Sequence, residues 1–130
     1  MGPKLGQMNS ERFVIDTNIF ILRVNDRLAE LLPRGEIICS VITEIELLSF
    51  PALTSAEEIL LRSTLARVAV YGIDQDIKEE AIRLRRQSRL KLPDAIIAAT
   101  ALCHQAVLVT NDNELQKVPG LKSQSLAVRQ

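Results

Sequence analysis

Carboxylates follow short apolar runs at two places in this 130-residue sequence. Asp16 comes directly after Phe13-Val14-Ile15, and Asp112 closes a segment that begins with the apolar run from 106 to 109. Asp94 has a different context, beside a proline that should open a helix. Aspartate is a preferred helix N-cap, and a helix N-terminus favours a negative charge. Capping is therefore the better interpretation of each of these three residues when it is taken alone.

Glu44 is harder to explain as a helix cap. On a helical wheel that starts at Val41, Glu44 falls at the edge of an apolar stripe. Glu46 falls between Ile42 and the polar Thr43, nearer the expected solvent side. A carboxylate beside an apolar stripe is costly unless it is paired, hydrogen-bonded or bound to a metal. For Glu44 alone, a salt bridge to an arginine and a metal ligand both stay open.

Taken together, these carboxylates form a donor set made of oxygen atoms only. Several carboxylates that converge repel one another unless a cation neutralises them. Oxygen ligands without a matched set of His or Cys select Mg²⁺ or Mn²⁺ rather than Zn²⁺. Such an ion lowers the pKa of a bound water and stabilises charge on phosphorus oxygens. The chemistry that this set favours is hydrolysis of a phosphodiester bond.

The sequence resembles PIN-domain ribonucleases, and most closely the VapC toxins of type II toxin–antitoxin pairs. The resemblance spans about Phe13 to Leu126, and four segments carry it: Asp16-Thr17-Asn18, Glu44 in the second helix, 94–101 (DAIIAATA), and Val109-Thr110-Asn111-Asp112. It implies a Mg²⁺- or Mn²⁺-dependent endoribonuclease that acts in the cytoplasm on RNA. It also implies a homodimer and a cognate antitoxin protein that covers the acidic cleft.

The same resemblance assigns roles to individual residues. The catalytic and metal-binding positions would be Asp16, Glu44, Asp94 and Asp112. Supporting polar groups that hold carboxylates or water in place would be Thr17, Asn18 and Thr110. Glu114 stands where the family often has a further Asp, and it is grouped with these supporting residues although it is one methylene longer.

A basic stripe leads toward Asp94. Lys78, Arg85 and Arg89 follow at i, i+7 and i+11, and the candidate RNA-binding residues are Arg85, Arg86, Arg89 and Lys91. A solvated helix face and a grip on the RNA backbone are both open interpretations. Because 16 basic and 16 acidic side chains cancel, any attraction for nucleic acid must come from such a local patch.

Short strands that alternate with helices must position these side chains. The patterns predict strands at 13–15, 36–39, 68–71 and 106–109, with an edge strand within 121–128. They predict helices at 19–32, 41–49, 54–68, 74–89 and 95–104, and a short one after Asp112. This alternation indicates an α/β fold: one three-layer α/β/α domain with a short, mostly parallel sheet and helices on both faces. Ligands of such sheets bind beyond the carboxyl ends of the strands.

Composition fits a single soluble domain, with 47% hydrophobic and 25% charged residues. We assign residues 9–130 to the PIN-like domain, and residues 1–8 to a flexible leader or expression remnant. No apolar run reaches the roughly 20 residues that span a bilayer, so no membrane association is expected. Cys39 and Cys103 are predicted to be buried free thiols in a reducing cytosol.

Two other functions compete with the ribonuclease. A phosphoacceptor receiver module would normally show acidic neighbours at Asp16 and a Lys after a later strand, and this sequence has neither. A catalytically silent PIN-like scaffold that binds RNA or protein would be expected to have lost acidic positions, and all four are present. The ribonuclease is therefore the preferred hypothesis.

Overall fold

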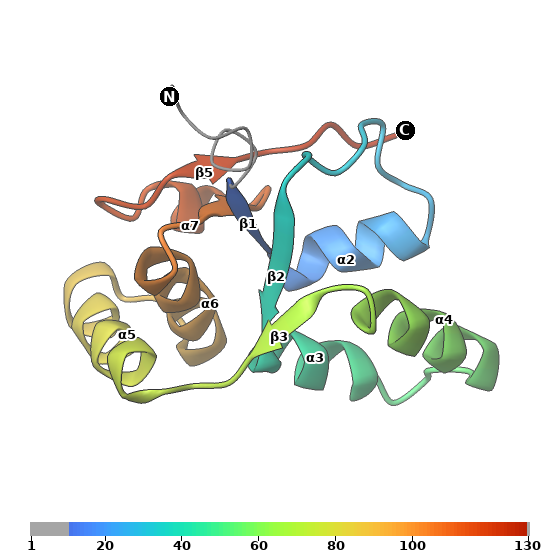
Figure 1. Ribbon diagram of the computed structural model, residues 1–130, viewed down its shortest axis with the longest axis horizontal. Helices are drawn as coiled ribbons and strands as arrows, with labels where there is room; N and C mark the ends of the chain where they lie inside the picture. The colour runs from blue at the N-terminus through green and yellow to red at the C-terminus, as the bar shows by residue number, and fades with distance from the viewer. Residues whose placement is uncertain (1–10, 130) are drawn as a thin grey trace, which may run out of the picture.

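The computed structural model describes residues 11–129 and arranges them around one five-stranded sheet (Figure 1). The strands are β1 (Arg12–Ile15), β2 (Glu36–Ser40), β3 (Ala69–Tyr71), β4 (Val107–Val109) and β5 (Ser123–Gln124). The helices are α2 (Thr17–Val24), α3 (Val41–Leu48), α4 (Ser55–Leu65), α5 (Gln75–Ser88), α6 (Leu92–Cys103) and α7 (Asn113–Gln116). Each strand is followed by one or two helices before the next strand, in the order that the sequence predicted.

The order of the strands places two predicted site residues side by side. The sheet order is β3-β2-β1-β4-β5, and every neighbouring pair is parallel. The chain moves outward from β1 to β3 and then returns to the other side of β1 with β4. A ligand crevice forms at such a reversal, beyond the carboxyl ends of the two strands. Ile15 pairs with Val109 there, so Asp16 and the 110–112 turn leave the sheet together.

Helices cover both faces of the sheet, which confirms the predicted three layers. Val14 points to one face and packs in a core with residues of α5, α6 and α7. Its neighbours Phe13 and Ile15 point to the other face and pack with residues of α2, α3 and α4. Figure 1 shows α5 and α6 on one side of β2 and α2, α3 and α4 on the other. The alternation of side chains along β1 therefore divides the protein into two cores.

Helix α6 carries Asp94 to the same crevice. The helix is buried nearly all round from Ala95 to Ala101, as its apolar sequence predicted, and it contacts β1, β2 and β4. A short turn joins its end directly to β4, so α6 runs against the strands. Its first turn, with Asp94, therefore lies at the carboxyl edge of the sheet.

The chain after Val24 differs from the prediction. Helix α2 ends at Val24 instead of near Leu32, because Asn25 closes it and Asp26 takes a left-handed conformation with φ 55°. The predicted edge strand over 121–128 shrinks to the two residues of β5 and one antiparallel bridge between Leu28 and Val128. Asn and Asp adopt left-handed backbone more readily than other residues that carry a side chain, so this pair stops the helix early.

The predictions for the cysteines, for membrane-spanning helices and for the leader have different outcomes. Both cysteines are free thiols, but only Cys39 is buried, whereas Cys103 at the end of α6 is exposed. Among residues 11–129, no helix has the length and apolar character needed to cross a membrane. The predicted leader, residues 1–8, lies outside the described residues, as do the first two residues of the predicted domain.

Candidate active site

Asp16 is held by a hydrogen bond from across the sheet and does not cap the helix that follows it. Its N–H donates to the Val109 C=O at 3.0 Å, which extends the β1–β4 pairing by one residue. Its side chain is 4% exposed and forms no capping bond to α2. Instead the Thr110 hydroxyl donates to its Oδ2 at 2.7 Å. The capping interpretation therefore fails for Asp16, whose carboxylate is buried at the crevice.

Asp112 is tied to Asp16 through the same hydroxyl. The Asp112 N–H donates to the Thr110 Oγ1 at 3.0 Å, while that Oγ1 donates its proton to Asp16. Asp112 does cap α7, because its Oδ1 accepts the Glu114 N–H at 2.8 Å. The capping interpretation is thus correct for one oxygen of Asp112. The Thr110 hydroxyl links the Asp16 carboxylate to the backbone N–H of Asp112.

Asp94 and Asp16 are coupled electrostatically to the other carboxylates. Burial, together with the charges of Asp16, Asp112 and Glu46, raises the pKa of Asp94 to about 6, and nearby Lys91 partly offsets the rise. Burial also raises the pKa of Asp16, helped by the charges of Asp112 and Glu46 and opposed by its hydrogen bonds. Asp16 and Asp94 thus both lie within reach of the charges of Asp112 and Glu46, which is expected of members of one cluster.

The glutamate that joins this cluster is Glu46 and not the predicted Glu44. The Thr17 hydroxyl donates to the Glu46 Oε1 at 2.7 Å and accepts a hydrogen bond from the Thr43 hydroxyl at 3.0 Å, since one hydroxyl has one proton to give. Glu44 instead adds its charge to the environment of the Cys39 thiol. The acidic position predicted on α3 is therefore corrected by two residues.

The error came from Thr43, which the helical wheel counted as a solvent-side residue. Thr43 is 0% exposed, because its hydroxyl has a partner on α2. Glu46 follows Thr43 by three positions and so shares its face of the helix. The signal that could have found Glu46 is this Thr-x-x-Glu spacing on α3, opposite a threonine that directly follows Asp16.

Comparison with known protein families identifies the family to which this fold belongs. The PIN domain profile matches residues 13–121. The chain belongs to the PIN domain family. It is similar to a chain of a toxin–antitoxin complex from Klebsiella pneumoniae at 34% sequence identity and a TM-score of 0.70, covering 83% of this chain and 93% of that one.

Two further solved structures share the fold of this PIN domain. A chain of VapBC-1 from nontypeable Haemophilus influenzae is 26% identical with a TM-score of 0.68, covering 88% of this chain and 97% of that one. A chain of VapBC2 from Rickettsia felis, bound to a DNA fragment from its promoter, is 19% identical with a TM-score of 0.71 over 88% and 98%. Comparison with curated proteins gives no match. The PIN domain is VapC-like, as the sequence resemblance indicated.

The predicted supporting groups of the PIN domain divide into two kinds. Thr17 and Thr110 are buried and hold Glu46 and Asp16, as described above. Asn18 is exposed on the first turn of α2. Glu114 is also exposed, and its carboxylate faces Lys117 at 3.8 Å. The structure therefore brings the two threonines into the cluster and leaves the side chains of Asn18 and Glu114 at the surface.

The donor chemistry of the cluster fits a hard divalent cation. Within residues 11–129, no group of three or more acidic, histidine or cysteine side chains could hold a metal ion as it stands. None of the ion pairs in that part of the chain uses Asp16, Glu46, Asp94 or Asp112. Asp16 is buried and Glu46, Asp94 and Asp112 are half-buried. Carboxylates that repel one another in such surroundings favour a neutralising cation, and carboxylate oxygens are the ligands that Mg²⁺ and Mn²⁺ prefer.

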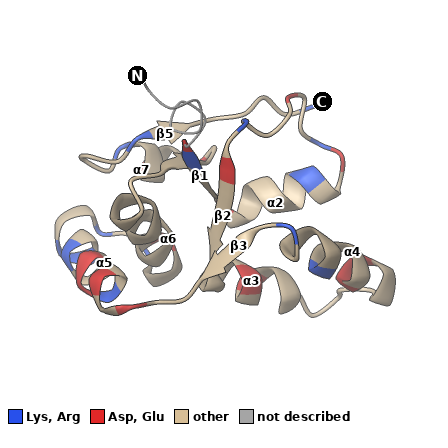
Figure 2. Ribbon diagram, in the orientation of Figure 1, with Lys and Arg blue, Asp and Glu red and all other residues tan. Residues whose placement is uncertain are grey.

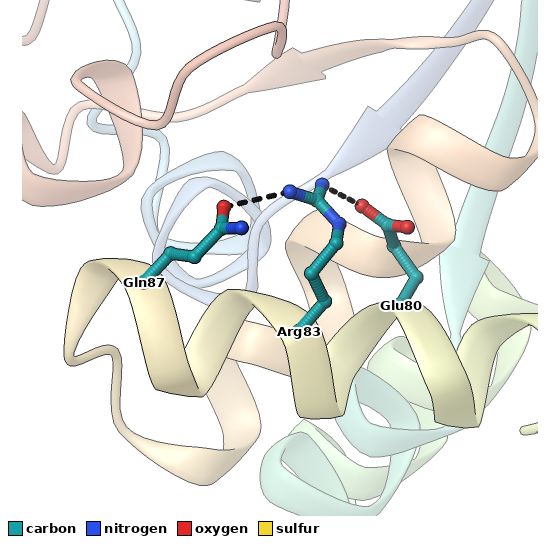
Figure 3. Close-up of polar contacts among 3 residues, drawn as sticks. All are labelled: Glu80, Arg83 and Gln87. Carbon is teal, nitrogen blue, oxygen red and sulfur yellow. Dashed lines mark hydrogen bonds and ion pairs between the residues drawn. The ribbon is translucent and has the colours of Figure 1, made fainter.

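The basic residues of α5 are not equivalent, although they share one helix (Figure 2). Arg83 is held by two neighbours on the helix surface: it pairs with Glu80 and donates to the Gln87 Oε1 at 2.7 Å (Figure 3). Arg86 lies with Arg83 and Gln87 in a shallow depression on that surface. Of the predicted RNA-binding set, Arg86 thus lies on the outer surface of α5.

The turn from α5 to α6 carries the rest of the predicted basic set. Arg85 donates through Nε to the Leu90 C=O at 3.3 Å, and Arg89 between them is left-handed with φ 54°. Lys91 is exposed, and its charge lowers the pKa of Asp94. Arg85 therefore braces the turn, and Lys91 is the basic residue whose proximity to the carboxylates is established.

Proposed function

We propose that this VapC-like PIN domain is a metal-dependent endoribonuclease that hydrolyses RNA phosphodiester bonds in the cytoplasm, as the toxin of a toxin–antitoxin pair. The observation that carries the proposal is the coupling of four carboxylates at the crevice beyond β1 and β4. The similarity to a chain of a toxin–antitoxin complex from Klebsiella pneumoniae, and to a chain of VapBC-1, supports the toxin role. A silent scaffold would have no need for buried and half-buried carboxylates that destabilise one another.

Asp16, Glu46, Asp94 and Asp112 would hold Mg²⁺ or Mn²⁺, with Glu46 in the position first assigned to Glu44. When bound, the ion supplies a positive charge that stabilises the phosphate and favours ionisation of the attacking water. The chain's own hydroxyls do the positioning: that of Thr110 fixes Asp16 against Asp112, and that of Thr17 orients Glu46. Such supporting contacts hold ligands in their working rotamers.

The α5–α6 turn would bind the RNA backbone next to the reacting phosphate. Lys91 lies near Asp94, and Arg89 stands two residues before it on the same exposed turn. Positive side chains position nucleic acid through its phosphates without reading the bases. We assign backbone binding to Arg89 and Lys91, a bracing role to Arg85, and a peripheral role to Arg86.

An antitoxin would dock in an apolar groove on the α2, α3 and α4 side of the sheet. The groove has a volume of about 280 Å³ and lies between α2 and α4, lined mainly by Ile21, Val24, Leu47, Phe50, Leu53 and Leu60. Phe50 and Leu60 are half exposed there, at 49% and 48%. An amphipathic helix of a partner can bury such a groove. For the predicted homodimer, Ile45, Ile82 and Leu92 offer further exposed apolar side chains.

The decisive experiment measures cleavage of mixed RNA with Mg²⁺, Mn²⁺ or EDTA. We expect cleavage only with metal, and a loss of about 100-fold or more in Asp16→Asn. Asp74→Asn is the matched control, because Asp74 caps α5 through the Ile77 N–H at 2.9 Å and asparagine caps equally well. Cleavage in EDTA, or full activity of Asp16→Asn, would contradict the metal mechanism. RNA binding without any cleavage would favour the silent scaffold.

A further inference from the structure

The chain beyond β5 is tied to the active-site turn by the side chain of Asn111, which has no role in the mechanism above. Backbone pairing of β4 and β5 ends where the Thr110 N–H donates to the Gln124 C=O at 3.0 Å. Asn111 then continues it with its side chain: Nδ2 donates to the Leu126 C=O at 2.9 Å, and the Leu126 N–H donates to Oδ1 at 2.8 Å. A side-chain amide offers the same donor and acceptor as a peptide group.

The segment around Leu126, to which Asn111 is hydrogen-bonded, is held in place by the rest of the protein. Leu126 is 4% exposed and belongs to the core between the sheet and α2. Two residues later, Val128 forms the antiparallel bridge with Leu28, and backbone hydrogen bonds lie on either side of it. Asn111 is therefore bonded to a segment that is itself held by burial of Leu126 and by backbone hydrogen bonds.

Asn111 also stands between Thr110 and Asp112, whose hydroxyl and backbone N–H form the link to the Asp16 carboxylate. The Thr110 C=O accepts from the Gln116 Nε2 at 2.9 Å, and the Thr110 hydroxyl links Asp16 with Asp112. If the 110–112 turn rotated, both bonds to the backbone of Leu126 would break at the same time. The paired bonds therefore oppose any motion that would separate Asp112 from Asp16.

We propose that Asn111 is a positioning residue, which holds the 110–112 turn so that Thr110 and Asp112 keep their places beside Asp16. Its effect on catalysis rests on the nuclease function proposed above. Its effect on the turn does not, because the hydrogen bonds belong to the chain itself. Without the amide, the turn opens more often, and the Thr110 hydroxyl links the Asp16 carboxylate to the Asp112 N–H for a smaller part of the time.

The first test uses metal-free protein and native-state hydrogen exchange. Asn111→Ala should speed exchange of the Asp112 and Leu126 amide hydrogens by about tenfold or more, with the amide of buried Val14 unchanged. Asn113→Ala is the matched control, since Asn113 is an exposed asparagine of the same segment. Equal exchange at Asp112 in wild type and Asn111→Ala would overturn the proposal. If the alanine variant does not fold, Asn111→Ser, which keeps one polar group, carries the same test.

The second test measures RNA cleavage as a function of Mg²⁺. Asn111→Ala should lower kcat about tenfold and raise the Mg²⁺ concentration for half-maximal rate several-fold, with the KM for RNA within about twofold. The kcat and the Mg²⁺ dependence of Asn111→Ser should lie between those of wild type and those of Asn111→Ala. Wild-type kcat and Mg²⁺ dependence in Asn111→Ala would overturn the catalytic part of the proposal. If wild-type protein cleaves no RNA, the proposed function fails, and the exchange experiment still decides the positioning role.

Discussion

Glu44 and Glu46 differ by two positions on one short helix, yet their surroundings are unlike. Glu46 accepts a hydrogen bond from the Thr17 hydroxyl, and its charge raises the pKa values of Asp16 and Asp94. The charge of Glu44 instead raises the pKa of the buried Cys39 thiol. Two identical side chains thus have different chemistry because one turn of α3 presents them to different neighbours. They form a matched pair for mutation.

Glu46→Gln should lower kcat/KM for RNA by about 100-fold, because the neutral amide removes a metal ligand while keeping the side chain's size. Glu44→Gln should stay within about twofold of wild type, since its carboxylate is outside the cluster. Steady-state cleavage assays of both purified variants provide the comparison. The reverse pattern, with Glu44→Gln inactive, would restore the position that the sequence alone suggested.

Asp94 makes the metal-free protein less stable as the pH rises. Its pKa is raised from 3.8 to about 6 in the folded state, so folding favours the protonated form. The stabilisation is complete below pH 3.8 and is lost as the pH passes through about 6. Asp94→Asn cannot ionise, so its free energy of unfolding should exceed that of wild type at pH 7.5 by about 1 kcal/mol, after a discount for solvent exposure.

Thermal unfolding in EDTA from pH 4 to pH 8 measures this difference. The Tm advantage of Asp94→Asn should grow over that range to about 3–5 °C. Excess Mg²⁺ should reverse the order, because only wild type keeps all the ligands. A variant that is less stable than wild type at every pH would show that Asp94 is structurally required instead of strained.

Among the elements, the strands and most helices could be predicted from sequence, and the exceptions have local causes. Alternating apolar residues in β1 and the nearly uniform apolar sequence of α6 depend only on which faces are buried. Helix α2 ends early because Asn25 closes it and Asp26 takes a left-handed backbone, although the apolar pattern continues past them. The buried position of Thr43 depends on a hydroxyl partner on another helix, and no local pattern reveals such a partner.

Gly35 illustrates an element boundary that tolerates no side chain. Its φ of +144° is a conformation that other residues rarely adopt, and a Cβ would lie 2.4 Å from the Glu11 carbonyl oxygen and 2.8 Å from the Phe13 ring. Gly35→Ala should therefore lower the free energy of unfolding by about 2–4 kcal/mol in denaturant titration. Gly72→Ala is the control, because a Cβ there meets nothing within 4 Å. Equal stability of the two variants would contradict this prediction, because it would mean that the backbone at the start of β2 can shift to accommodate a side chain.

Over the whole molecule, basic and acidic side chains balance, with 16 of each. The general field of the protein therefore does not attract RNA, and the proposed attraction comes from the α5–α6 turn. If RNA binding depends strongly on salt, that dependence must come from the few basic residues of this turn. The acidic crevice beside that turn also means that RNA binding and metal binding should support each other, since the ion offsets the repulsion between phosphate and carboxylates.

Lys91→Ala and Arg89→Ala should each reduce the slope of log Kd against log salt by about 1 in the presence of Mg²⁺. Arg83→Ala is the control, because Arg83 is already paired with Glu80 and should leave the slope unchanged. Fluorescence anisotropy with a catalytically inactive Asp16→Asn background measures binding without cleavage. An unchanged slope in Lys91→Ala would contradict RNA binding by this turn and would indicate an ordinary solvated surface.

The two cysteines stand at opposite extremes of exposure. Cys39 is 0% exposed, and burial together with the charge of Glu44 raises its pKa to about 12, which closes it to reagents. Cys103 lies at the far end of α6 from Asp94, about 14 Å along the helix axis. A maleimide dye should therefore attach at one place in the unaltered protein. Energy transfer from that dye to a labelled RNA would then report substrate arrival without disturbing the carboxylates.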